Sequence, residues 1–521
     1  MMAFLKGNSF NKTDREKREN ELTFRNLLNF QLHQTPQYEM TLPSPPPRIH
    51  SGCTRKQRSA EAASRMGRSR HGGRHGNLDV IGSKIVWLFC ICCKKKFTSI
   101  MLIMMGLILS CSVPKEVEEP LTVIRQPAEF EPTAAVWLIW PPADHTAETS
   151  NSAVTLNIME ALGTDVKVVV TCANDVVCEQ ARSRIAERFK EQSHITVQPL
   201  ASVEIWARDM GPTFVETNQG LAVADFQFNS WGYSDTTDAD NQTEERYDRS
   251  AAALLKLPVI KTKLFSEGGN REVNGQGTLM LSEIVERGRN PAMSLKEMEA
   301  EFERTLGVTH VVWLKKGLHE DDHTFLGPIE LEDGEPAYTV ITTNGHIDEF
   351  ARFVNDSTVL LAQVDSADFD DPIAYENHLR MQENFNILEK ARDQDGQPFH
   401  IVRLTLPRTI VATMKPGDGV YDYIKTLNYQ DGSTFPEGEA VKVIAAASYL
   451  NFLITSNIVL GQKYWREGWD PVLKVRDSLA ERTLMRVFPD REVVMLDALA
   501  VNLGGGGIHC ITMQQPFFGN N

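Results

Sequence analysis

The run Ala134-Ala-Val-Trp-Leu-Ile-Trp140 decides the architecture, because an apolar stretch of this length closed by Pro141-Pro142 is typical of a buried strand. Regular helix and strand patterns begin here and continue toward the C-terminus. The expected helices cover residues 154–162, 174–189, 295–306 and 474–487, and the expected strands after them cover 166–171, 195–200, 308–314 and 492–496.

The recurring order of helix, strand and polar turn predicts an α/β fold. Ser294-Leu-Lys-Glu297 is a capping box at the start of one helix, and Gly307 ends that helix. Polar turns follow two of the units, at Trp206-Ala-Arg-Asp209 and at Gly504-Gly-Gly-Gly-Ile-His-Cys510. We expect a weak internal repeat of α/β units about one centre, because no regular sequence period indicates a solenoid.

Charge divides the chain into two parts. Residues 1–96 hold 18 basic and 7 acidic side chains, whereas residues 97–521 hold 36 and 62. An acidic body lacks the basic patches that neutralise phosphates, so we expect no nucleic-acid partner. The body has three cysteines, Cys172, Cys178 and Cys510, too few for a disulfide framework.

The N-terminal part has the pattern of a leader and an export signal. Residues 1–93 are interpreted as a basic leader of low order or as the product of a misassigned start codon. Within 94–111, three lysines precede a short apolar run that ends in Ser110-Cys111, as in a bacterial lipoprotein signal with Cys111 as the lipid attachment. A buried helix and an uncleaved anchor are the alternatives.

These assignments divide the chain and predict its location. Residues 112–129 are expected to be a tether, and residues 130–521 the functional domain. We expect an exported protein held at the membrane only through its N-terminal lipid. If the signal is not used, the expected location is cytoplasmic.

One motif has the letters of a zinc site without its setting. His319-Glu-Asp-Asp-His323 matches H-E-x-x-H, which needs a helix to bring both imidazoles onto one face. The stretch instead lies between Gly317 and Gly327-Pro328 with almost no apolar flank, so we expect a loop and no metal.

A second motif, His346-Ile-Asp348, places a histidine and a carboxylate two residues apart. On a strand the two side chains would point to the same side. The pair is also two-thirds of a non-haem iron triad that would take a distant histidine as its third ligand. A core histidine satisfied by its neighbour is the plain alternative.

Two further motifs carry charge or a nucleophile. Arg208 and Asp209 lie in a turn exposed by Gly211-Pro212, where an ordinary salt bridge is one interpretation. Gly504–Gly507 lack the Lys and Ser/Thr of a phosphate-binding loop. Cys510 with His346 is a plausible nucleophile and base, whereas a strand would point His509 away from Cys510. A lone cysteine is also commonly a buried small hydrophobe.

Taken together, five blocks resemble the agmatine deiminase family, which includes the bacterial type of peptidylarginine deiminase. The likeness runs from about Phe130 to Pro516. The blocks are Trp206-Ala-Arg-Asp-Met-Gly-Pro212, Ser266-Glu-Gly-Gly-Asn270, Gly345-His-Ile-Asp-Glu-Phe350, Ala447-Ser-Tyr-Leu-Asn-Phe452 and Gly504-Gly-Gly-Gly-Ile-His-Cys-Ile-Thr512.

The resemblance implies an α/β five-bladed propeller, the pentein fold, with ββαβ-like units around a central active site. It implies hydrolysis of a guanidinium without metal or organic cofactor. Residue by residue, it implies Cys510 as nucleophile, His346 as acid and base, Asp209 and Asp348 as guanidinium-binding carboxylates, and Glu267 as support for the histidine. Trp206, Asn451 and Arg208 are expected to contact substrate.

The leading hypothesis is conversion of agmatine to N-carbamoylputrescine and ammonia through a covalent thiouronium on Cys510, as in polyamine metabolism and putrescine biosynthesis. A peptidylarginine deiminase and a guanidine-binding lipoprotein without activity remain alternatives. The segment Trp140–Ala147 lacks the aromatic residue expected of agmatine deiminases, and long connections at 313–345 and 365–440 are expected to cover the site. A homodimer is the family expectation.

Overall fold

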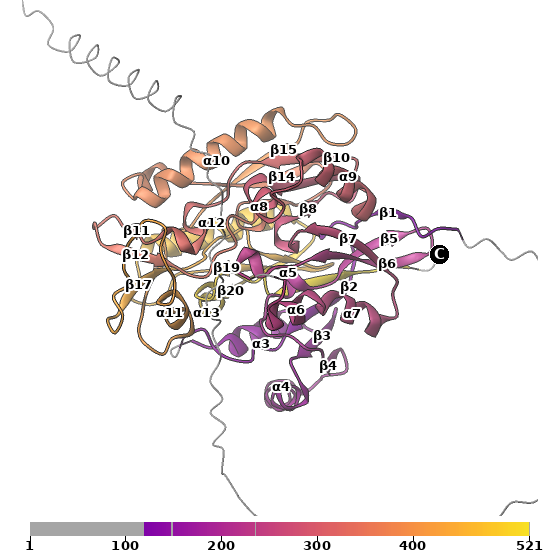
Figure 1. Cartoon of the computed structure of the whole chain (residues 1–521), viewed down its shortest axis with the longest axis horizontal. Helices are drawn as coiled ribbons and strands as arrows, with labels where there is room; N and C mark the ends of the chain where they lie inside the picture. The colour runs from indigo at the N-terminus through magenta and orange to yellow at the C-terminus, as the bar shows by residue number, and fades with distance from the viewer. Residues whose placement is uncertain (1–118, 147–148, 235, 520–521) are drawn as a thin grey trace, which may run out of the picture. The chain divides into compact units, whose positions relative to one another are not determined.

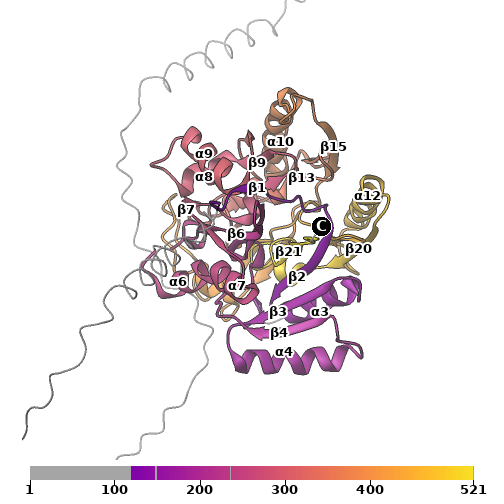
Figure 2. The same ribbon diagram turned by 90° about the vertical axis from the view of Figure 1, so that its right-hand side faces the viewer.

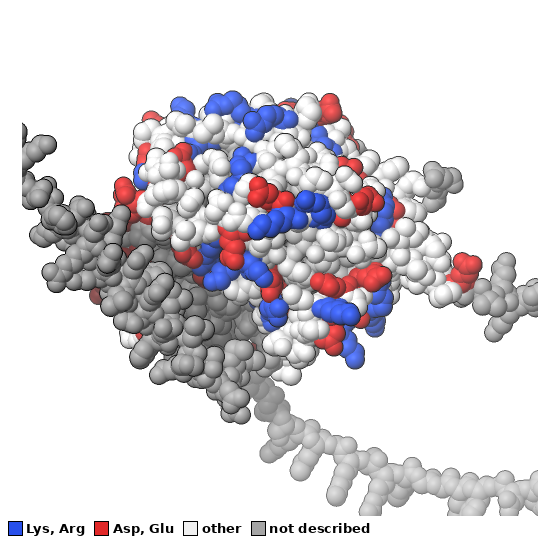
Figure 3. Space-filling model, turned by 90° about the horizontal axis from the view of Figure 1, so that it is seen from above, with Lys and Arg blue, Asp and Glu red and all other residues white. Residues whose placement is uncertain are grey.

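The computed structural model describes residues 119–146, 149–234 and 236–519, and their strands form six small sheets (Figure 1). The leader and the signal segment, with Cys111, lie outside the described residues. Within the part of the chain that the structure describes, no helix has the length and apolar character needed to cross a membrane. Basic and acidic side chains are intermingled on the face drawn in Figure 3.

The run at residues 134–140 is a buried strand, as predicted. This strand pairs in parallel with the strand that follows it and antiparallel with the last strand of the chain, so segments from both ends of the sequence share one sheet (Figure 2). The sheet has the order β21-β2-β3-β4. Its elements are β2 (Thr133–Ile139), α3 (Asn151–Leu162), β3 (Lys167–Cys172), α4 (Asp175–Arg188), β4 (Ile195–Pro199) and β21 (Thr512–Pro516).

Four further sheets repeat one unit, which confirms the predicted internal repeat of α/β units. In each unit two strands pair antiparallel, a helix or helix pair follows, and the next strand pairs in parallel with the middle one.

The first two units contain β5 (Thr213–Thr217), β6 (Gly220–Gln227), α6 (Ala239–Glu245), α7 (Tyr247–Leu255) and β7 (Val259–Phe265), then β8 (Glu272–Val273), β9 (Thr278–Ser282), α8 (Glu283–Arg289), α9 (Leu295–Leu306) and β10 (His310–Leu314). The other two contain β13 (Ala351–Phe353), β14 (Thr358–Gln363), α10 (Pro372–Lys390) and β15 (His400–Thr405), then β18 (Leu453–Ile454), β19 (Ile458–Lys463), α12 (Pro471–Val487) and β20 (Glu492–Asp497).

The sixth sheet has the order β11-β12-β17-β16. Three of its strands come from the two long segments that we expected to be connections, and β17 follows directly after the second segment. The prediction for 365–440 needs correction, because its first part forms α10 and β15 of a repeat unit. Only the later part belongs to the insertion. The inserted elements are β11 (Ile329–Glu330), β12 (Pro336–Thr339), β16 (Val411–Met414), α11 (Gly419–Ile424) and β17 (Val441–Ile444).

The expected tether needs a second correction. Strand β1 (Val123–Arg125) pairs antiparallel with β5, and the Arg125 guanidinium lies 2.9 Å from Glu216. Beyond it the chain enters the interior, where only 18% of the Glu129 side chain is exposed. The folded domain therefore begins before residue 130.

The predicted capping box shows how local signals fix an element. The Ser294 side chain accepts a hydrogen bond from the Glu297 N–H at 3.3 Å, and the Glu297 carboxylate accepts one from the Ser294 N–H at 2.8 Å. Helix α9 then buries Met298 and Phe302 in an apolar cluster against β7 and β9, and it ends at Gly307 with φ of +67°.

Candidate active site

Cys510 lies in a turn between helix α13 (Leu499–Asn502) and strand β21. The glycines before it allow close packing that a side chain would prevent. Gly505 has φ of +123°, and a Cβ on it would collide with the Ile341 carbonyl oxygen. A Cβ on Gly506 would lie 2.9 Å from the Cys510 sulfur. The glycine run therefore sets the position of the thiol.

The Cys510 thiol, in a residue only 3% exposed, faces an amide and two carboxylates. Its Sγ lies 3.0 Å from Asn451 Nδ2, 3.6 Å from Asp348 Oδ2 and 4.0 Å from Glu349 Oε1. Burial raises the pKa of the Cys510 thiol well above its usual range, and the two carboxylates raise it further. These surroundings favour the neutral thiol, whereas a cation bound beside it would favour the thiolate.

His346 stands directly before a short 3-10 helix, η5 (Ile347–Glu349), which corrects the strand expected for this motif. Its Nε2 lies 3.3 Å from Glu267 Oε2, and its Nδ1 lies 3.7 Å from Asp209 Oδ1. Burial lowers the pKa of His346, but the two carboxylates outweigh burial and bring the pKa to about 9. His346 therefore carries a proton at neutral pH.

The side chain of Asp209, which lines the cavity, is fixed by two hydrogen bonds. It lies on the short helix α5 (Ala207–Met210), where Trp231 Nε1 and the Gly269 N–H each donate to it at 2.8 Å. A Cβ on Gly269 would lie 2.6 Å from His346 Nδ1. Burial raises the pKa of Asp209, and the charge of His346 opposes that rise.

Glu267 contacts His346, the residue that the resemblance expects it to support. It precedes the 3-10 helix η2 (Gly268–Asn270), and its Oε1 accepts a hydrogen bond from Arg289 Nε at 2.7 Å. Burial alone would raise the pKa of Glu267, but Arg289 and His346 lower it to about 2. The carboxylate therefore stays charged and holds the imidazolium.

The two oxygens of Asp348 have different surroundings. Oδ2 accepts hydrogen bonds from His509 Nδ1 at 2.7 Å and from Asn451 Nδ2 at 3.2 Å. Burial opposes ionisation, but His509 lowers the pKa of Asp348 below its usual value. Oδ1 is buried without a hydrogen-bond partner among the described residues, as are His346 Nδ1 and Glu349 Oε2. Buried polar atoms of this kind require an explanation, and a bound ligand supplies one.

A cavity of about 140 Å³ reaches Cys510 and Asp209 from outside the molecule. Trp206 lines it, as predicted, and stacks on His145 with 5.8 Å between ring centroids. His145 comes from Trp140–Ala147, the segment that lacks the aromatic residue expected of agmatine deiminases. Asn451 contacts the Cys510 sulfur and does not line the cavity. Part of the inserted region lines the cavity through Gly419 and Val420.

The expectation that Arg208 contacts substrate needs correction. Its guanidinium points away from the cavity, where Nη1 lies 2.6 Å from Glu129 Oε1 and Nη2 donates to Gln514 Oε1. The reason is local. Helix α5 turns neighbouring side chains in different directions, so Asp209 faces the cavity and Arg208 faces the interior.

The zinc motif contains one short 3-10 helix, η3 (His319–Asp321), and no α-helix, and its last residue, His323, directly precedes a second 3-10 helix, η4 (Thr324–Leu326). Asp321 has a structural task there, because it accepts hydrogen bonds from the Thr343 N–H and the Gly345 N–H at 3.0 Å each. It thus fixes the loop that carries His346. Among the described residues, neither this motif nor an iron triad of His346, Asp348 and a second histidine is gathered into a ligand group.

Sequence reasoning missed several residues that hold the site. His509 was assigned to a strand, yet it lies in the turn and contacts Asp348. Glu129 was placed in the tether, and no local signal marks it because its partners are distant in sequence. The one signal in the sequence that could have pointed to these partners is the pair of charged residues Glu349 and Arg352. Charged residues beside a buried motif need partners, and such partners can be distant in sequence.

The chain is similar to known deiminases in sequence and in structure. Residues 125–326 and 329–516 match the Porphyromonas-type peptidyl-arginine deiminase family. The agmatine deiminase of Pseudomonas aeruginosa is 32% identical over 404 residues, covering 75% of this chain and 95% of that protein. The agmatine deiminase of Medicago truncatula is 31% identical over 408 residues, covering 75% and 96%. The solved agmatine deiminase of Enterococcus faecalis has a TM-score of 0.58 at 26% identity, covering 75% and 95%.

Proposed function

Because the chain belongs to the Porphyromonas-type peptidyl-arginine deiminase family, we propose that it hydrolyses a guanidinium group to a ureido group and ammonia. The proposed substrate is agmatine, and the product is N-carbamoylputrescine. Related agmatine deiminases at 30% identity or more across most of their length support this class of C–N hydrolase.

The observation that carries the proposal is that Asp348 and Glu349, whose carboxyl groups contact the thiol, each have a second oxygen that is buried without a hydrogen-bond partner among the described residues. Asp348 Oδ1 accepts no hydrogen bond within the described residues although it is buried, and Asp348 is ionised. A guanidinium is planar, always charged and rich in N–H donors, so it satisfies a carboxylate in this position. Its charge also offsets the repulsion that raises the pKa of Cys510.

The residues divide the chemistry between nucleophile and acid. We infer that substrate binding favours the Cys510 thiolate, and that its sulfur attacks the central guanidinium carbon to form a C–S bond. One C–N bond then breaks, and the departing nitrogen takes a proton from His346 and leaves as ammonia. The pKa of His346, about 9, gives it that proton at neutral pH.

In the second half of the reaction, His346 accepts a proton instead of donating one. The first half leaves a thiouronium on Cys510, and neutral His346 then removes a proton from water. The hydroxide adds to the same carbon, the C–S bond breaks to return the Cys510 thiolate, and the ureido product leaves after its hydroxyl proton passes to water. Glu267 and Asp209 stabilise the imidazolium in both halves through their contacts with His346.

The choice of agmatine rests on the charges around the cavity. Asp144, Glu204 and Asp209 line it, and no lysine or arginine does so among the described residues. A second cationic group on the substrate is attracted here, whereas the carboxylate of free or C-terminal arginine is repelled. This distribution favours a diamine-like guanidine over an amino acid.

The repeat units also support the propeller. The sheet β21-β2-β3-β4 has the pairing of the other four units, with β2 antiparallel to β21 and parallel to β3. We infer that these sheets are five units of one closed propeller, completed by pairing the last strand with the first unit. Export, lipidation of Cys111 and a homodimer remain proposals from the sequence. Detergent partitioning of the cell-expressed protein and of its Cys111→Ser variant tests the lipid.

A substrate panel tests the activity. Ammonia release is measured with agmatine, free arginine, a peptide with C-terminal arginine and one with internal arginine, with Cys510→Ala as the blank. We expect activity with agmatine that survives chelators. Preference for a peptide would establish the peptidylarginine alternative, and release of ammonia from none of them would leave a binding protein and overturn the proposal.

A further inference from the structure

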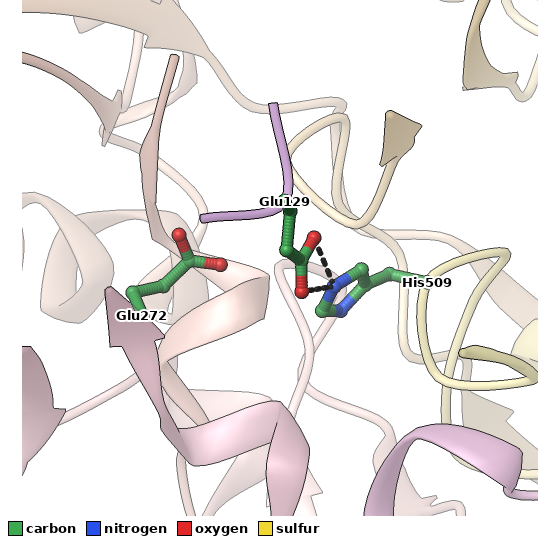
Figure 4. A group of neighbouring side chains, drawn as sticks. All are labelled: Glu129, Glu272 and His509. Carbon is green, nitrogen blue, oxygen red and sulfur yellow. Dashed lines mark hydrogen bonds and ion pairs between the residues drawn. The ribbon is translucent and has the colours of Figure 1, made fainter. Parts of the chain in front are cut away.

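Asp348 Oδ2, the oxygen that lies 3.6 Å from the Cys510 sulfur, is held by His509 and, through it, by further buried charged groups. We call this set the rear network, and Figure 4 shows three of its members as they approach one another. Its members are Glu129, Arg208, Glu272, Arg352 and His509.

His509 joins Asp348 to Glu129. Its Nδ1 lies 2.7 Å from Asp348 Oδ2, and its Nε2 lies 2.9 Å from both oxygens of Glu129. Both ring nitrogens thus face carboxylates, and only an imidazolium donates from both. The ring is fully buried, so neither contact is replaced by bulk water.

Glu129 is fixed in turn by two guanidinium groups. Arg208 Nη1 and Arg352 Nη2 each lie 2.6 Å from its oxygens, and Gln514 Nε2 donates at 3.0 Å. Burial opposes ionisation of Glu129, but Arg208, His509 and Arg352 hold its pKa well below the usual range. The carboxylate is therefore charged and has little freedom to turn.

Glu129, Glu272 and His509 place possible ligand atoms close enough for a metal ion. The cations of the network already occupy that position, because Arg352 donates to both Glu129 and Glu272. Arg352 thus lies between the two glutamates, which favours an ion-pair network over a metal site.

We propose that Glu129 is a positioning residue that acts through His509 to orient Asp348 toward the guanidinium of the substrate. The inference rests on the proposed function. A carboxylate presents one oxygen to a ligand reliably only when its other oxygen is held. Here the contacts that fix the carboxylate begin at Glu129, in the segment between β1 and β2.

The contacts that run from Glu129 through His509 to Asp348, which we call the relay, also affect the pKa of Asp348. Loss of Glu129 removes the partner of the His509 imidazolium, and the hydrogen bond from His509 is what keeps the pKa of Asp348 low despite burial. The pKa of Asp348 should then rise, so activity should fail at a higher pH on the acid side. The other charged or titratable groups acting on Asp348 are His346, Glu349, Arg352, Asp209, Asp321 and Cys510.

The experiment compares Glu129→Gln with Glu272→Gln in the whole chain. Both variants remove a buried carboxylate from Arg352, but only Glu129 contacts His509. We expect Glu129→Gln to lower kcat/KM for agmatine by about 10- to 100-fold and to move the acid limb of its pH profile upward. Burial raises the pKa of Glu272 to about 7, so Glu272 itself could produce the acid limb of the pH profile. If that limb is unchanged in Glu272→Gln, titration of Glu272 does not produce it.

His509→Gln provides a second break in the relay, and we expect it to move the acid limb in the same direction. The double variant should show little further loss, because both changes interrupt one chain of contacts. A small cavity of about 40 Å³ borders Glu129, so we also expect formate to restore part of the activity of Glu129→Ala and none in Glu272→Ala.

The proposal is overturned if folded Glu129→Gln keeps the wild-type limb and kcat/KM, or if Glu272→Gln changes them equally. If Glu129→Gln does not fold, His509→Gln decides by the same limb, and failure of both to fold overturns the proposal in favour of a purely structural role. A wild-type protein that releases no ammonia marks failure of the proposed function instead.

Discussion

The two sides of Asp348 differ in how completely their polar atoms are paired. The cavity side consists of the lining residues Cys510 and Asp209 and their neighbours His346, Asp348 and Glu349. Here Asp348 Oδ1, His346 Nδ1 and Glu349 Oε2 are buried without hydrogen-bond partners among the described residues. On the rear side, the carboxylates of Glu129 and Glu272 each contact a cation. On the cavity side, the unpaired buried atoms carry a free-energy cost until substrate binds. On the rear side, the paired charges hold Asp348 in the geometry that substrate binding requires.

This contrast predicts opposite behaviour of substitutions on the two sides. Changes beside the cavity should abolish turnover while leaving the fold as stable as before or more so. Changes in the rear network should reduce stability, because removing one partner leaves a buried charge without compensation. Each experiment below tests one part of that division.

The largest effect is expected for Cys510→Ala. Loss of the nucleophile should reduce kcat for agmatine by about 10⁴- to 10⁶-fold. The thermal midpoint should not fall, since the change removes only a thiol that stands against the carboxyl groups of Asp348 and Glu349. Ammonia release and thermal unfolding on the same preparation check both parts. If the variant loses stability together with activity, Cys510 belongs to the residues that stabilise the fold, and the predicted division is wrong.

Sequence alone predicted much of the cavity side. Cys510, His346, Asp209, Asp348 and Glu267 stand in short blocks with glycines, and the structure brings all five together. The helices and strands with clear periodicity or capping were also predicted, because those signals act between residues close in sequence.

The rear network could not be predicted in the same way. Glu129 and His509 are 380 positions apart, and their contact exists only after the chain closes on itself. A charged residue beside a proline-rich segment is typical of a solvated linker, so Glu129 has no local mark of burial. Arg208 was misplaced for a related reason: the sequence shows two charges side by side but not the direction of each on a short helix.

The next largest effect is expected in the rear network. Arg352 is fully buried and donates to Leu450 O at 3.0 Å and Phe452 O at 2.8 Å as well as to two carboxylates. Arg352→Leu should lower the free energy of unfolding by about 3–5 kcal/mol, because two buried carboxylates lose their cation. Urea unfolding measures the change.

Arg287→Leu is the matched control for that substitution. Arg287 also pairs with a glutamate, Glu283, but its side chain is 53% exposed. A surface pair of this kind contributes little, so the change should stay within about 0.5 kcal/mol. Equal losses in the two variants would remove the distinction between buried network and surface pairs.

A smaller effect is expected in the pH profile. The pKa of His346 is raised to about 9, so kcat/KM for agmatine should stay high through neutral pH and fall above about pH 9 as His346 loses its proton. Glu267→Gln removes a carboxylate that raises this pKa, and its basic limb should begin at lower pH. A basic limb that does not move in the variant would exclude Glu267 as the support of His346.

The smallest effect concerns the outer part of the cavity side. Glu204 lines the cavity at partial exposure, so its attraction for a second cationic group on the substrate is screened by water. Glu204→Gln should raise KM for agmatine by about two- to fivefold with little change in kcat, and should leave KM for a guanidine with an uncharged tail unaltered. The difference between the two substrates isolates charge from packing. A parallel rise for both would mean that Glu204 shapes the entrance, and that the carboxylates around the cavity do not select the substrate by charge.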